Sequence, residues 1–587
     1  MKRLLSFLLA TMMLFSLCTG FAFAETGEGG TAQQEHSVEM REFTLYLFDS
    51  TNTMDALLPL YFIDGVDDLP YMEVEYFVSM LCSLCSELYS DPDYDISLVD
   101  LNPVVVLTRE SDYSVSLDFE KDVISFVDFA AFMHNSEDSS LLDLLSIAGY
   151  DQERNPLLFR RDKQQSFDRF GDIKTIDLAS YGIDMLSVGE DYFVPLQTLN
   201  DIFFYPAVGT GLLYNGEAVF FANDQQMFDY NTGRITPLGK LYYSAPTGQR
   251  SDELAEFTYN ELCLVLDLLY GLKETHDISS FRQTFWEIGF DEALSGNDSV
   301  DADQALRQFI DYYLDDLHSG FNSFSPLSGL VETGEDVGAS LRKLYENSDR
   351  YEDARAAVYG DDVPGYEEVG NTAYITFDNF TVRLDEAREY YDRYEAGELP
   401  EDTLGLIIYA HEQITREDSP IENVALDLSC NTGGAVDAAV FVLSWFLGDA
   451  QISVKDMTSG ALSTAVYQAD INMDKVFDSE DTVADRKLYC LISPVSFSCG
   501  NLVPAALKAS QKVTLLGKTS GGGSCAVQPL STAYGTLFQI SGRQRLSFLK
   551  NGSFYDIDHG VDPDYYINNI DNYYCREALT DFINHLF

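Results

Sequence analysis

Residues 424–434 read VALDLSCNTGG, and a long apolar stretch follows them at 438–447. The apolar residues around Asp427 predict a buried strand, and the stretch after the two glycines predicts a helix. A strand that enters a helix through Asn-x-Gly-Gly leaves backbone N–H groups free at the start of the helix, where glycine lets the backbone approach a ligand closely. Taken alone, the segment also fits an ordinary tight turn between a strand and a helix.

A second segment has the same strand-to-helix pattern. Residues 488–501 read LYCLISPVSFSCGN and precede a helical pattern that runs from Leu502 to Lys508. A serine at the mouth of such a turn, here Ser498, directs its hydroxyl outward, and the N–H of Cys499 points to the same side. This arrangement suits an acyl-transfer nucleophile with an oxyanion donor beside it. Serine is also common at the start of helices, so the pattern alone is a weak signal.

Two further segments complete the pattern. Residues 513–523 read VTLLGKTSGGG, and residues 556–564 read DIDHGVDPD. In this order the four segments resemble the catalytic domain of the C-terminal-processing, or tail-specific, serine peptidases, a family that includes the tricorn core and the chlamydial protease-like factor. The resemblance covers residues 300–587. It implies a crotonase-like or Clp-like α/β domain with a helical subdomain, Ser498 as nucleophile, and the N–H groups of Gly433 and Cys499 as the oxyanion hole.

The same resemblance offers two kinds of general base. The tail-specific branch uses a lysine after the serine, but the corresponding position here is Gly523, with Lys518 and Lys508 as the nearest lysines. The tricorn-like and chlamydial branch uses a histidine from an upstream motif, which stands here as DLHSG at 316–320. His318 is therefore the predicted base, since a histidine with an ordinary pKa near 6.5 is suited to proton transfer at neutral pH.

A carboxylate is expected to orient the imidazole and to stabilise its cation. In the histidine branch it precedes the GVxPD segment, where this sequence offers Asp558 and, as the alternative, Asp556. His559 is a competing base candidate, although it also fits an ordinary loop histidine. The predicted catalytic residues are thus Ser498, His318 and Asp558.

The rest of the chain divides into parts of different character. Short alternating strands and a weak repeat (63–81 and 186–204) indicate an α+β accessory region without chemistry of its own, and helical periodicity follows it. The predicted organisation is a signal peptide at 1–24, a flexible leader at 25–41, the accessory region at 42–245, a helical subdomain with His318 at 246–330, and the α/β catalytic domain at 331–587.

Charge and composition limit location and partners. Lys2 and Arg3, an apolar stretch and Ala24 form a secretory signal, with a retained membrane anchor as the alternative reading. The formal net charge of −60 repels phosphate backbones, so a nucleic-acid partner is not expected. Cys82 and Cys85 form a CxxC inside an apolar helical pattern, which favours core packing over redox or metal chemistry, and the seven histidines show no metal-binding pattern. No cofactor, metal or membrane span after signal cleavage is predicted.

These observations predict a secreted serine endopeptidase that cleaves protein or peptide substrates through an acyl-enzyme. Two alternatives remain open. The chain could be an inactive extracellular binding or scaffold protein on a peptidase fold, because Ser429 stands where relatives carry an arginine and an aspartate replaces the usual glutamate. It could also be a hydrolase of cell-wall peptides or esters, which secretion and the accessory repeats suggest.

Overall fold

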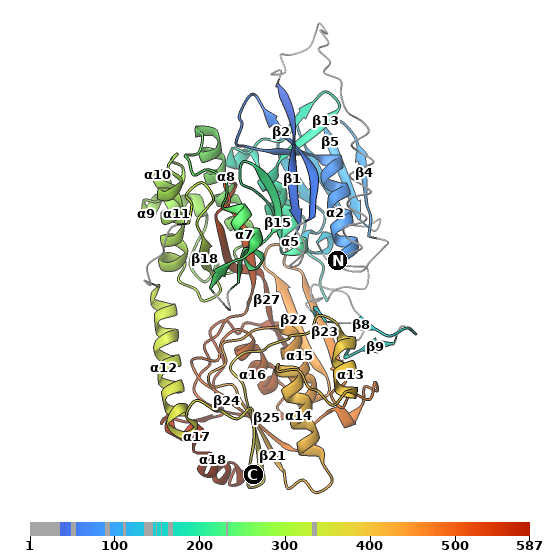
Figure 1. The fold of residues 1–587 in the computed structure, drawn as a ribbon, viewed down its shortest axis with the longest axis vertical. Coiled ribbons are helices and arrows are strands. Elements are labelled where there is room, and N and C mark those ends of the chain that lie inside the picture. Colours follow the sequence, from blue (N-terminus) through green and yellow to red (C-terminus); the bar gives the residue numbers. More distant parts are fainter. Residues whose placement is uncertain are drawn as a thin grey trace.

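The computed structural model describes residues 36–47, 54–88, 94–109, 113–133, 145–147, 149–153, 155–161, 168–229, 233–330 and 337–586. Figure 1 shows an upper lobe, built from the N-terminal strands and a group of helices, and a lower lobe built from the C-terminal half. The predicted signal peptide lies outside the described residues. Strand β1 (Val38–Leu47) begins within the predicted leader, because all ten of its residues pair in register with β2 (Met54–Ile63).

Two sheets form the accessory region. A seven-stranded sheet has the order β12-β13-β3-β2-β1-β15-β14, and a five-stranded antiparallel sheet has the order β11-β7-β6-β5-β4. The strand-rich character predicted for this region is confirmed. Besides β1 and β2, the strands of the two sheets are β3 (Tyr71–Glu73), β4 (Ile96–Asp100), β5 (Val104–Arg109), β6 (Tyr113–Asp118), β7 (Val123–Phe126), β11 (Lys174–Asp177), β12 (Leu186–Val188), β13 (Asp191–Pro195), β14 (Gly211–Tyr214) and β15 (Ala218–Ala222).

The weak internal repeat corresponds to two similar units. In the first, β3 leads directly into α2 (Val74–Leu88), and in the second, β13 leads into α4 (Leu196–Leu199) and a π-helical turn, η2 (Asn200–Phe204). The two units meet because β13 pairs antiparallel with β3, with Pro195 opposite Tyr71. Cys85 of the CxxC is fully buried in α2, and its thiol and that of Cys82 are free.

Helices and a long connector follow the accessory region. Ser251 caps α8 (Asp252–Leu269), and Asp298 caps α11 (Ser299–Gln308) through the N–H groups of its first turn. Helix α11 continues into η3 (Phe309–Leu314), which ends at Asp315 with φ 45°. The chain then passes His318, forms β18 (Gly320–Ser323) and later enters α12 (Ala339–Tyr359).

A mostly parallel sheet carries the α/β part of the lower lobe. Its order is β19-β20-β21-β24-β25-β29, and β20, β21, β24 and β25 run parallel. The carboxyl ends of the neighbouring strands β21 (Asn423–Asp427) and β24 (Lys487–Ile492) lie side by side, which places the loops at 428–435 and 493–498 together at one sheet edge. These loops lead into α15 (Val436–Leu447) and α16 (Cys499–Ala509), as predicted.

A second sheet of the lower lobe joins all parts of the chain. Its order is β10-β23-β22-β27-β18, with β26 and β28 also paired to β27. Strand β10 (Phe159–Arg161) comes from the accessory region and β18 from the segment with His318, so this sheet crosses the predicted boundaries at 245 and 330. The fourteen-residue β27 (Leu537–Lys550) runs between the two lobes in Figure 1.

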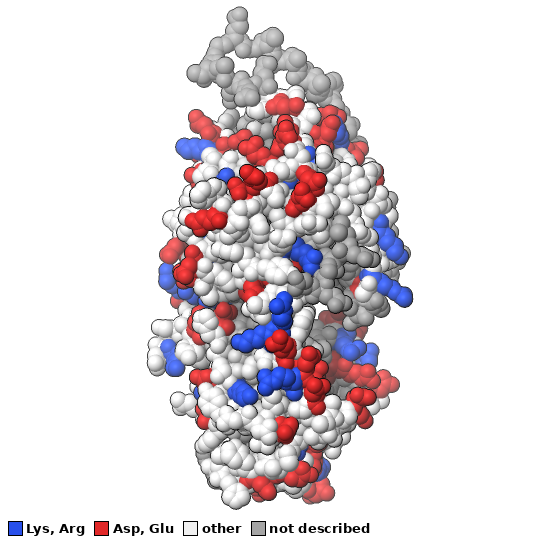
Figure 2. Space-filling model, turned by 90° about the vertical axis from the view of Figure 1, so that its left-hand side faces the viewer, with Lys and Arg blue, Asp and Glu red and all other residues white. Residues whose placement is uncertain are grey.

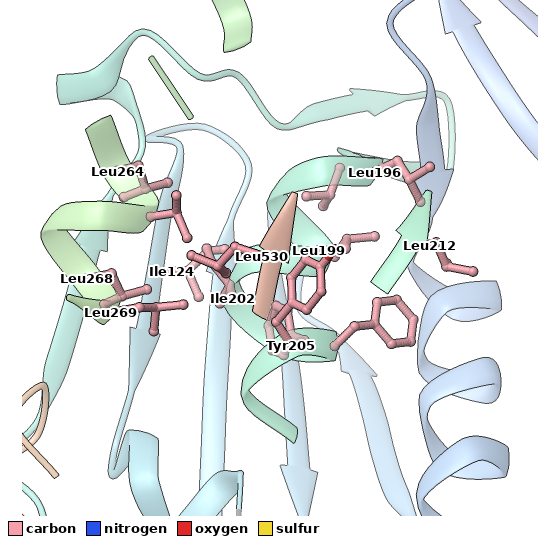
Figure 3. Packing of buried hydrophobic residues seen from close by; sticks show 14 of the residues in the cluster. Ile124, Leu196, Leu199, Ile202, Tyr205, Leu212, Leu264, Leu268, Leu269 and Leu530 are labelled. Carbon is pink, nitrogen blue, oxygen red and sulfur yellow. The ribbon is translucent and has the colours of Figure 1, made fainter. Parts of the chain in front are cut away.

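The accessory region and the C-terminal half share one hydrophobic core. Figure 3 shows Leu530 of β26 (Cys525–Ser531) between Ile124 and Leu199 of the accessory region and Leu268 of α8. Leu530 is 2% exposed, and the same cluster contains Phe538 and Ile540 of β27. Burial of this kind contributes about 25 cal/mol per Å² of apolar surface, so the upper lobe is an integral part of the fold rather than an attached module.

The remaining elements are the other strands of the sheets, two short pairs of strands, and further helices. They are α3 (Phe129–Phe132), β8 (Gly149–Tyr150), β9 (Pro156–Leu157), η1 (Ala179–Tyr181), α5 (Tyr205–Val208), α6 (Asp224–Met227), β16 (Phe228–Asp229), β17 (Arg234–Ile235), α7 (Pro237–Tyr242), α9 (Phe281–Ile288), α10 (Asp291–Leu294), β19 (Tyr366–Val369), β20 (Thr372–Thr376), α13 (Ala387–Glu395), α14 (Thr403–Thr415), β22 (Ala450–Asp456), β23 (Leu462–Ala469), η4 (Ser479–Asp481), β25 (Val513–Gly517), β28 (Ser553–Tyr555), β29 (Tyr565–Tyr566), α17 (Asp571–Tyr574) and α18 (Arg576–Asn584).

Two features are absent from the described residues. Among them, no helix has the length and apolar character needed to cross a membrane. The same part of the chain holds no group of three or more His, Cys, Asp or Glu side chains able to bind a metal ion. In Figure 2, acidic side chains are spread over the upper and lower parts of the face shown, and several Lys and Arg side chains gather near its middle.

Candidate active site

Ser498 occupies a strained position between β24 and α16. Its backbone has φ 56° and ψ −122°, a combination that residues other than glycine rarely adopt. An ordinary capping serine has an extended backbone and bonds the first turn of its helix, whereas the Ser498 side chain makes no such bond. The residue is half-buried. A strained serine between a strand and a helix is the geometry of a nucleophile elbow, which holds the hydroxyl away from its own backbone.

Hydrogen bonds from three directions hold this elbow. The Ser498 N–H donates to the Gly522 carbonyl at 3.0 Å, and the Phe497 N–H donates to the Asn431 carbonyl at 3.1 Å. The Ser498 carbonyl accepts the N–H of Leu502 at 2.8 Å, within α16. The strained backbone is therefore held in place by two glycine-containing loops, the one with Asn431 and the one with Gly522.

The Asn-x-Gly-Gly loop lies against the serine side chain. Gly433 has φ +114°, and a Cβ on this residue would lie 2.6 Å from Cβ and 3.1 Å from Oγ of Ser498, so only glycine fits. The Gly433 N–H donates to Asn431 Oδ1 at 3.0 Å, and the Cys499 thiol donates to the Gly434 carbonyl at 3.2 Å. Among the described residues, the Cys499 N–H has no acceptor. The predicted oxyanion donors therefore differ: Cys499 offers a free N–H, while that of Gly433 is engaged.

His318 is placed by a turn centred on Asp316. The Asp316 carboxylate accepts the N–H of His318 at 3.1 Å and both the N–H and hydroxyl of Ser319, at 2.8 and 2.7 Å. It also accepts the hydroxyls of Ser541 on β27 at 2.6 Å and of Tyr270 after α8 at 2.8 Å. Five donors thus fix this turn to two separate elements, and His318 is only 7% exposed.

The structure brings the His318 segment and the Ser498 segment together. The imidazole ring packs on the ring of Phe497, the residue before the serine, with ring centroids 4.6 Å apart. Within the described residues, no hydrogen bond joins the imidazole to Ser498. Catalytic hydrogen bonds in ligand-free enzymes are often long and shorten when substrate binds.

Burial and two carboxylates act on the imidazole in opposite directions. Burial lowers the pKa of His318 below its ordinary value, since the charged form is poorly solvated, while Asp316 and Asp558 partly offset this effect. The ring is therefore neutral at neutral pH and able to accept a proton. Asp558 is the predicted third member of the triad, and its electrostatic effect on His318 places it near the ring.

The two candidate aspartates have different surroundings. Asp558 Oδ1 accepts the N–H and hydroxyl of Ser524, and the Asp558 carbonyl accepts the Gly523 N–H. Asp556 instead forms an ion pair with Arg545 at 3.0 Å and accepts the N–H of Asp558 at 2.9 Å. Asp556 thus anchors the loop that carries Asp558.

The other base candidates lie in different environments. The Lys508 ammonium donates to the Asp562 carbonyl at 2.6 Å and pairs with Asp564 at 3.3 Å. His559 is exposed on the loop that follows Asp558. Gly523, at the position of the family's lysine, lies against the Phe497 ring: a Cβ there would be 2.5 Å from it.

Several residues of the site received no role from the sequence. Asp316 was only part of a motif, and its hydrogen bonds to Ser541 and Tyr270 join residues far apart in the chain. Asn501 is fully buried and donates to the Ile557 carbonyl at 2.9 Å while accepting the Ser520 hydroxyl at 2.7 Å, so it ties α16 to the loop of Asp558. In the sequence, its position directly after Ser498-Cys499-Gly500 was the signal that could have suggested a role for Asn501 in the site.

Comparison with known proteins agrees with this architecture. Residues 371–567 match the family described as Peptidase family S41. A search of curated protein sequences found no match.

Solved peptidases of several kinds are distantly similar in structure. The photosystem II D1 C-terminal processing protease is 18% identical (TM-score 0.26; 35% of this chain and 46% of that chain covered). Mature CPAF is 11% identical (TM-score 0.34; 57% and 96%), and the tricorn protease is 12% identical (TM-score 0.30; 84% and 60%). This chain thus spans less than half of the D1 processing protease, and likenesses this distant assign no residue roles.

The matched segment contains both glycine loops, the elbow with Ser498 and the loop with Asp558, and it comprises the parallel sheet that carries them. The fold is therefore the α/β, Clp-like catalytic fold with a strand-rich accessory region that the sequence predicted. Residues 371–567 thus form a domain that matches peptidase family S41.

Proposed function

We propose that this peptidase cleaves peptide bonds through an acyl-enzyme on Ser498, with His318 as general base and Asp558 as the carboxylate that stabilises the imidazolium. The observation that carries the proposal is the strained backbone of Ser498, whose side chain makes no hydrogen bond to the first turn of α16. Beside it lies the buried His318, on which two carboxylates act. An ordinary helix cap would need neither the strain nor the histidine.

In the proposed reaction His318 takes the Ser498 proton while Oγ attacks the substrate carbonyl carbon. The negative charge that develops on the carbonyl oxygen is stabilised by the N–H of Cys499 and by that of Gly433. For Gly433 the substrate oxygen replaces Asn431 Oδ1 as the acceptor. Each such donor is typically worth about 100- to 1000-fold in rate. The imidazolium then protonates the leaving amine, and water, activated by the same histidine, releases the acyl group.

The test is labelling of the purified protein with a fluorophosphonate, which reacts with activated serines. Wild type is expected to be labelled, while Ser498→Ala and His318→Ala stay unlabelled although they fold, as judged by circular dichroism. Equal labelling of wild type and Ser498→Ala would refute the assignment. A folded wild type that resists the reagent would favour a scaffold protein. Release of fragments from purified peptidoglycan would instead favour cell-wall peptides as substrates.

We further propose that the enzyme acts outside the cytoplasm after cleavage near Ala24, on the basis of Lys2, Arg3 and the apolar stretch that follows them. N-terminal sequencing of material from the culture medium should begin at Glu25. An intact N-terminus in the membrane fraction would indicate a retained anchor.

A further inference from the structure

The ring of Phe497 contacts the site on the side of the base. It is 8% exposed, and it packs on the His318 imidazole at 4.6 Å between centroids, with the ring planes 52° apart. Because Phe497 immediately precedes Ser498, its backbone is part of the elbow: its N–H bonds the Asn431 carbonyl, and it bridges to Gly522. One residue thus connects the nucleophile turn with the histidine.

Gly523 provides the space that this ring occupies. With φ +84°, it adopts a conformation that favours glycine, and a Cβ there would lie 2.5 and 2.6 Å from two atoms of the Phe497 ring edge. Its N–H also bonds the Asp558 carbonyl at 3.1 Å. The ring therefore lies between the His318 ring and the backbone that holds the loop of Asp558.

We propose that Phe497, seated in the space left by Gly523, is a positioning residue that shields the His318 ring from water and holds it beside the serine elbow. This inference rests on the proposed roles of Ser498 and His318. In this role Phe497 does more than fill an apolar position before the serine: it sets the pH range in which the His318 imidazole is neutral.

The charges around His318 determine the direction of the effect. The acidic groups that act on it are Asp316, in its own turn, and Asp558, in the loop opposite. Tyr270 and Cys525, which lie near both carboxylates, have pKa values raised by burial, to about 12 for Cys525, and stay neutral in the working range. Arg545, the cation beside Cys525, forms an ion pair with Asp556, and the charges that act on His318 are those of Asp316 and Asp558. If water reaches the imidazole, the effect of burial weakens and its pKa rises, since the carboxylates favour the cation.

The first experiment titrates His318 directly. Protein labelled with ¹³C in its histidines is followed by NMR, and the His318 signal is identified as the one missing from His318→Gln. In Phe497→Ala the pKa of His318 is expected to rise by about one unit. Phe497→Leu, which keeps an apolar side chain in place, should shift it less. An unchanged pKa in a folded Phe497→Ala protein overturns the proposal.

A pair of glycine variants provides a second, matched test. Gly523→Ala forces the ring away from its place and should also raise the pKa of His318. Gly552→Ala is the control, because Gly552 has a similar φ of +76° in an exposed hairpin with no atom within 4 Å of a new Cβ. Equal shifts in both variants, or none in Gly523→Ala, would contradict the mechanism.

Reaction rates separate this inference from the function on which it rests. The rate of fluorophosphonate labelling should fall at acidic pH about tenfold more in Phe497→Ala than in wild type and recover at alkaline pH, as expected for a shift of about one unit. If Ser498→Ala were labelled like wild type, the proposed function would fail while the titration remained interpretable. If Ser498→Ala is inert but the pH profile of Phe497→Ala equals that of wild type, only the role of Phe497 fails.

Discussion

At the scale of single residues, the site contains two aspartates that the sequence offered for one role. Both precede the GVDPD segment, and the sequence favoured Asp558, the nearer one, with Asp556 as the alternative. The structure distinguishes them by partners: Arg545 neutralises Asp556, whereas Asp558 acts on the imidazole. A carboxylate that already pairs with an arginine is a poor stabiliser of a second cation.

We therefore expect Asp558→Asn and Asp556→Asn to differ in catalysis. Asp558→Asn loses the charge that stabilises the imidazolium, and the rate of fluorophosphonate labelling should fall by roughly 100- to 10 000-fold, the range known for such carboxylates. Asp556→Asn keeps an oxygen for Arg545 and for the Asp558 N–H, so its rate should stay within about tenfold of wild type. The reverse order of the two rates would assign the triad to Asp556.

At the scale of secondary-structure elements, α12 connects the two halves of the site. At its N-terminus the Ser340 N–H donates to the carboxylate of Asp315, three residues before His318. Near its C-terminus Arg355 makes a bidentate ion pair with Asp378, at 2.6 Å for both bonds. The Asp378 carbonyl in turn accepts the N–H of Thr432, in the Asn-x-Gly-Gly loop. One helix thus joins the turn that holds His318 to the Asn-x-Gly-Gly loop.

Loss of the Arg355 side chain is expected to displace the oxyanion loop without unfolding the sheet. Because small displacements of catalytic groups lower rates by up to about 100-fold, Arg355→Ala should be labelled roughly 10- to 100-fold more slowly than wild type. Arg350→Ala on the same helix is the control, since Arg350 is exposed. A labelling rate of Arg355→Ala equal to that of the control would show that α12 is only a connector.

Most of these elements could be predicted from the sequence, because each has a local signal. Apolar strands that end in glycine or serine turns gave β21, β24 and their helices, and short alternating strands gave β5, β6 and β7. The pairing of β10 and β18 with the lower sheet had no such signal, since the partners of Phe159 and Gly320 are more than 200 residues away. The hydrogen bonds of Asp316 to Tyr270 and Ser541, which are 46 and 225 residues away, likewise have no signal in the local spacing.

At the scale of the whole molecule, two buried carboxyl groups lie where the accessory region meets α8. Asp201 of η2 and Glu261 of α8 are 1% and 2% exposed. One oxygen of each has a partner: Gln197 donates to Asp201 at 2.9 Å, and Thr198 donates to Glu261 at 2.7 Å. The other oxygens, Asp201 Oδ2 and Glu261 Oε1, have no other partner among the described residues. Gln197 also donates to the Ser531 carbonyl of β26, so this pair lies at the junction of all three parts.

The pair makes the stability of this junction depend on pH. Burial raises the pKa of Glu261 to about 7, and burial together with the nearby Glu261 raises that of Asp201. The folded protein therefore holds protons that the unfolded chain releases near pH 4 to 5. By linkage, Glu261 lowers the free energy of unfolding as pH rises from about 4.5 to about 7, and above that its contribution stays constant. Glu261→Gln, which cannot ionise, should lose this part of the pH dependence.

The measurement is the urea midpoint of wild type and Glu261→Gln between pH 4.5 and 8. The net charge of −60 also destabilises the fold as carboxylates ionise, so the quantity of interest is the difference between the two proteins at each pH. Glu261→Gln should gain stability relative to wild type as pH rises through this window. Glu256→Gln, an exposed change on the same helix, should run parallel to wild type throughout. If the curves of Glu261→Gln and wild type are parallel as well, Glu261 does not hold the extra proton in the folded protein, and the pH dependence of the junction does not come from this residue.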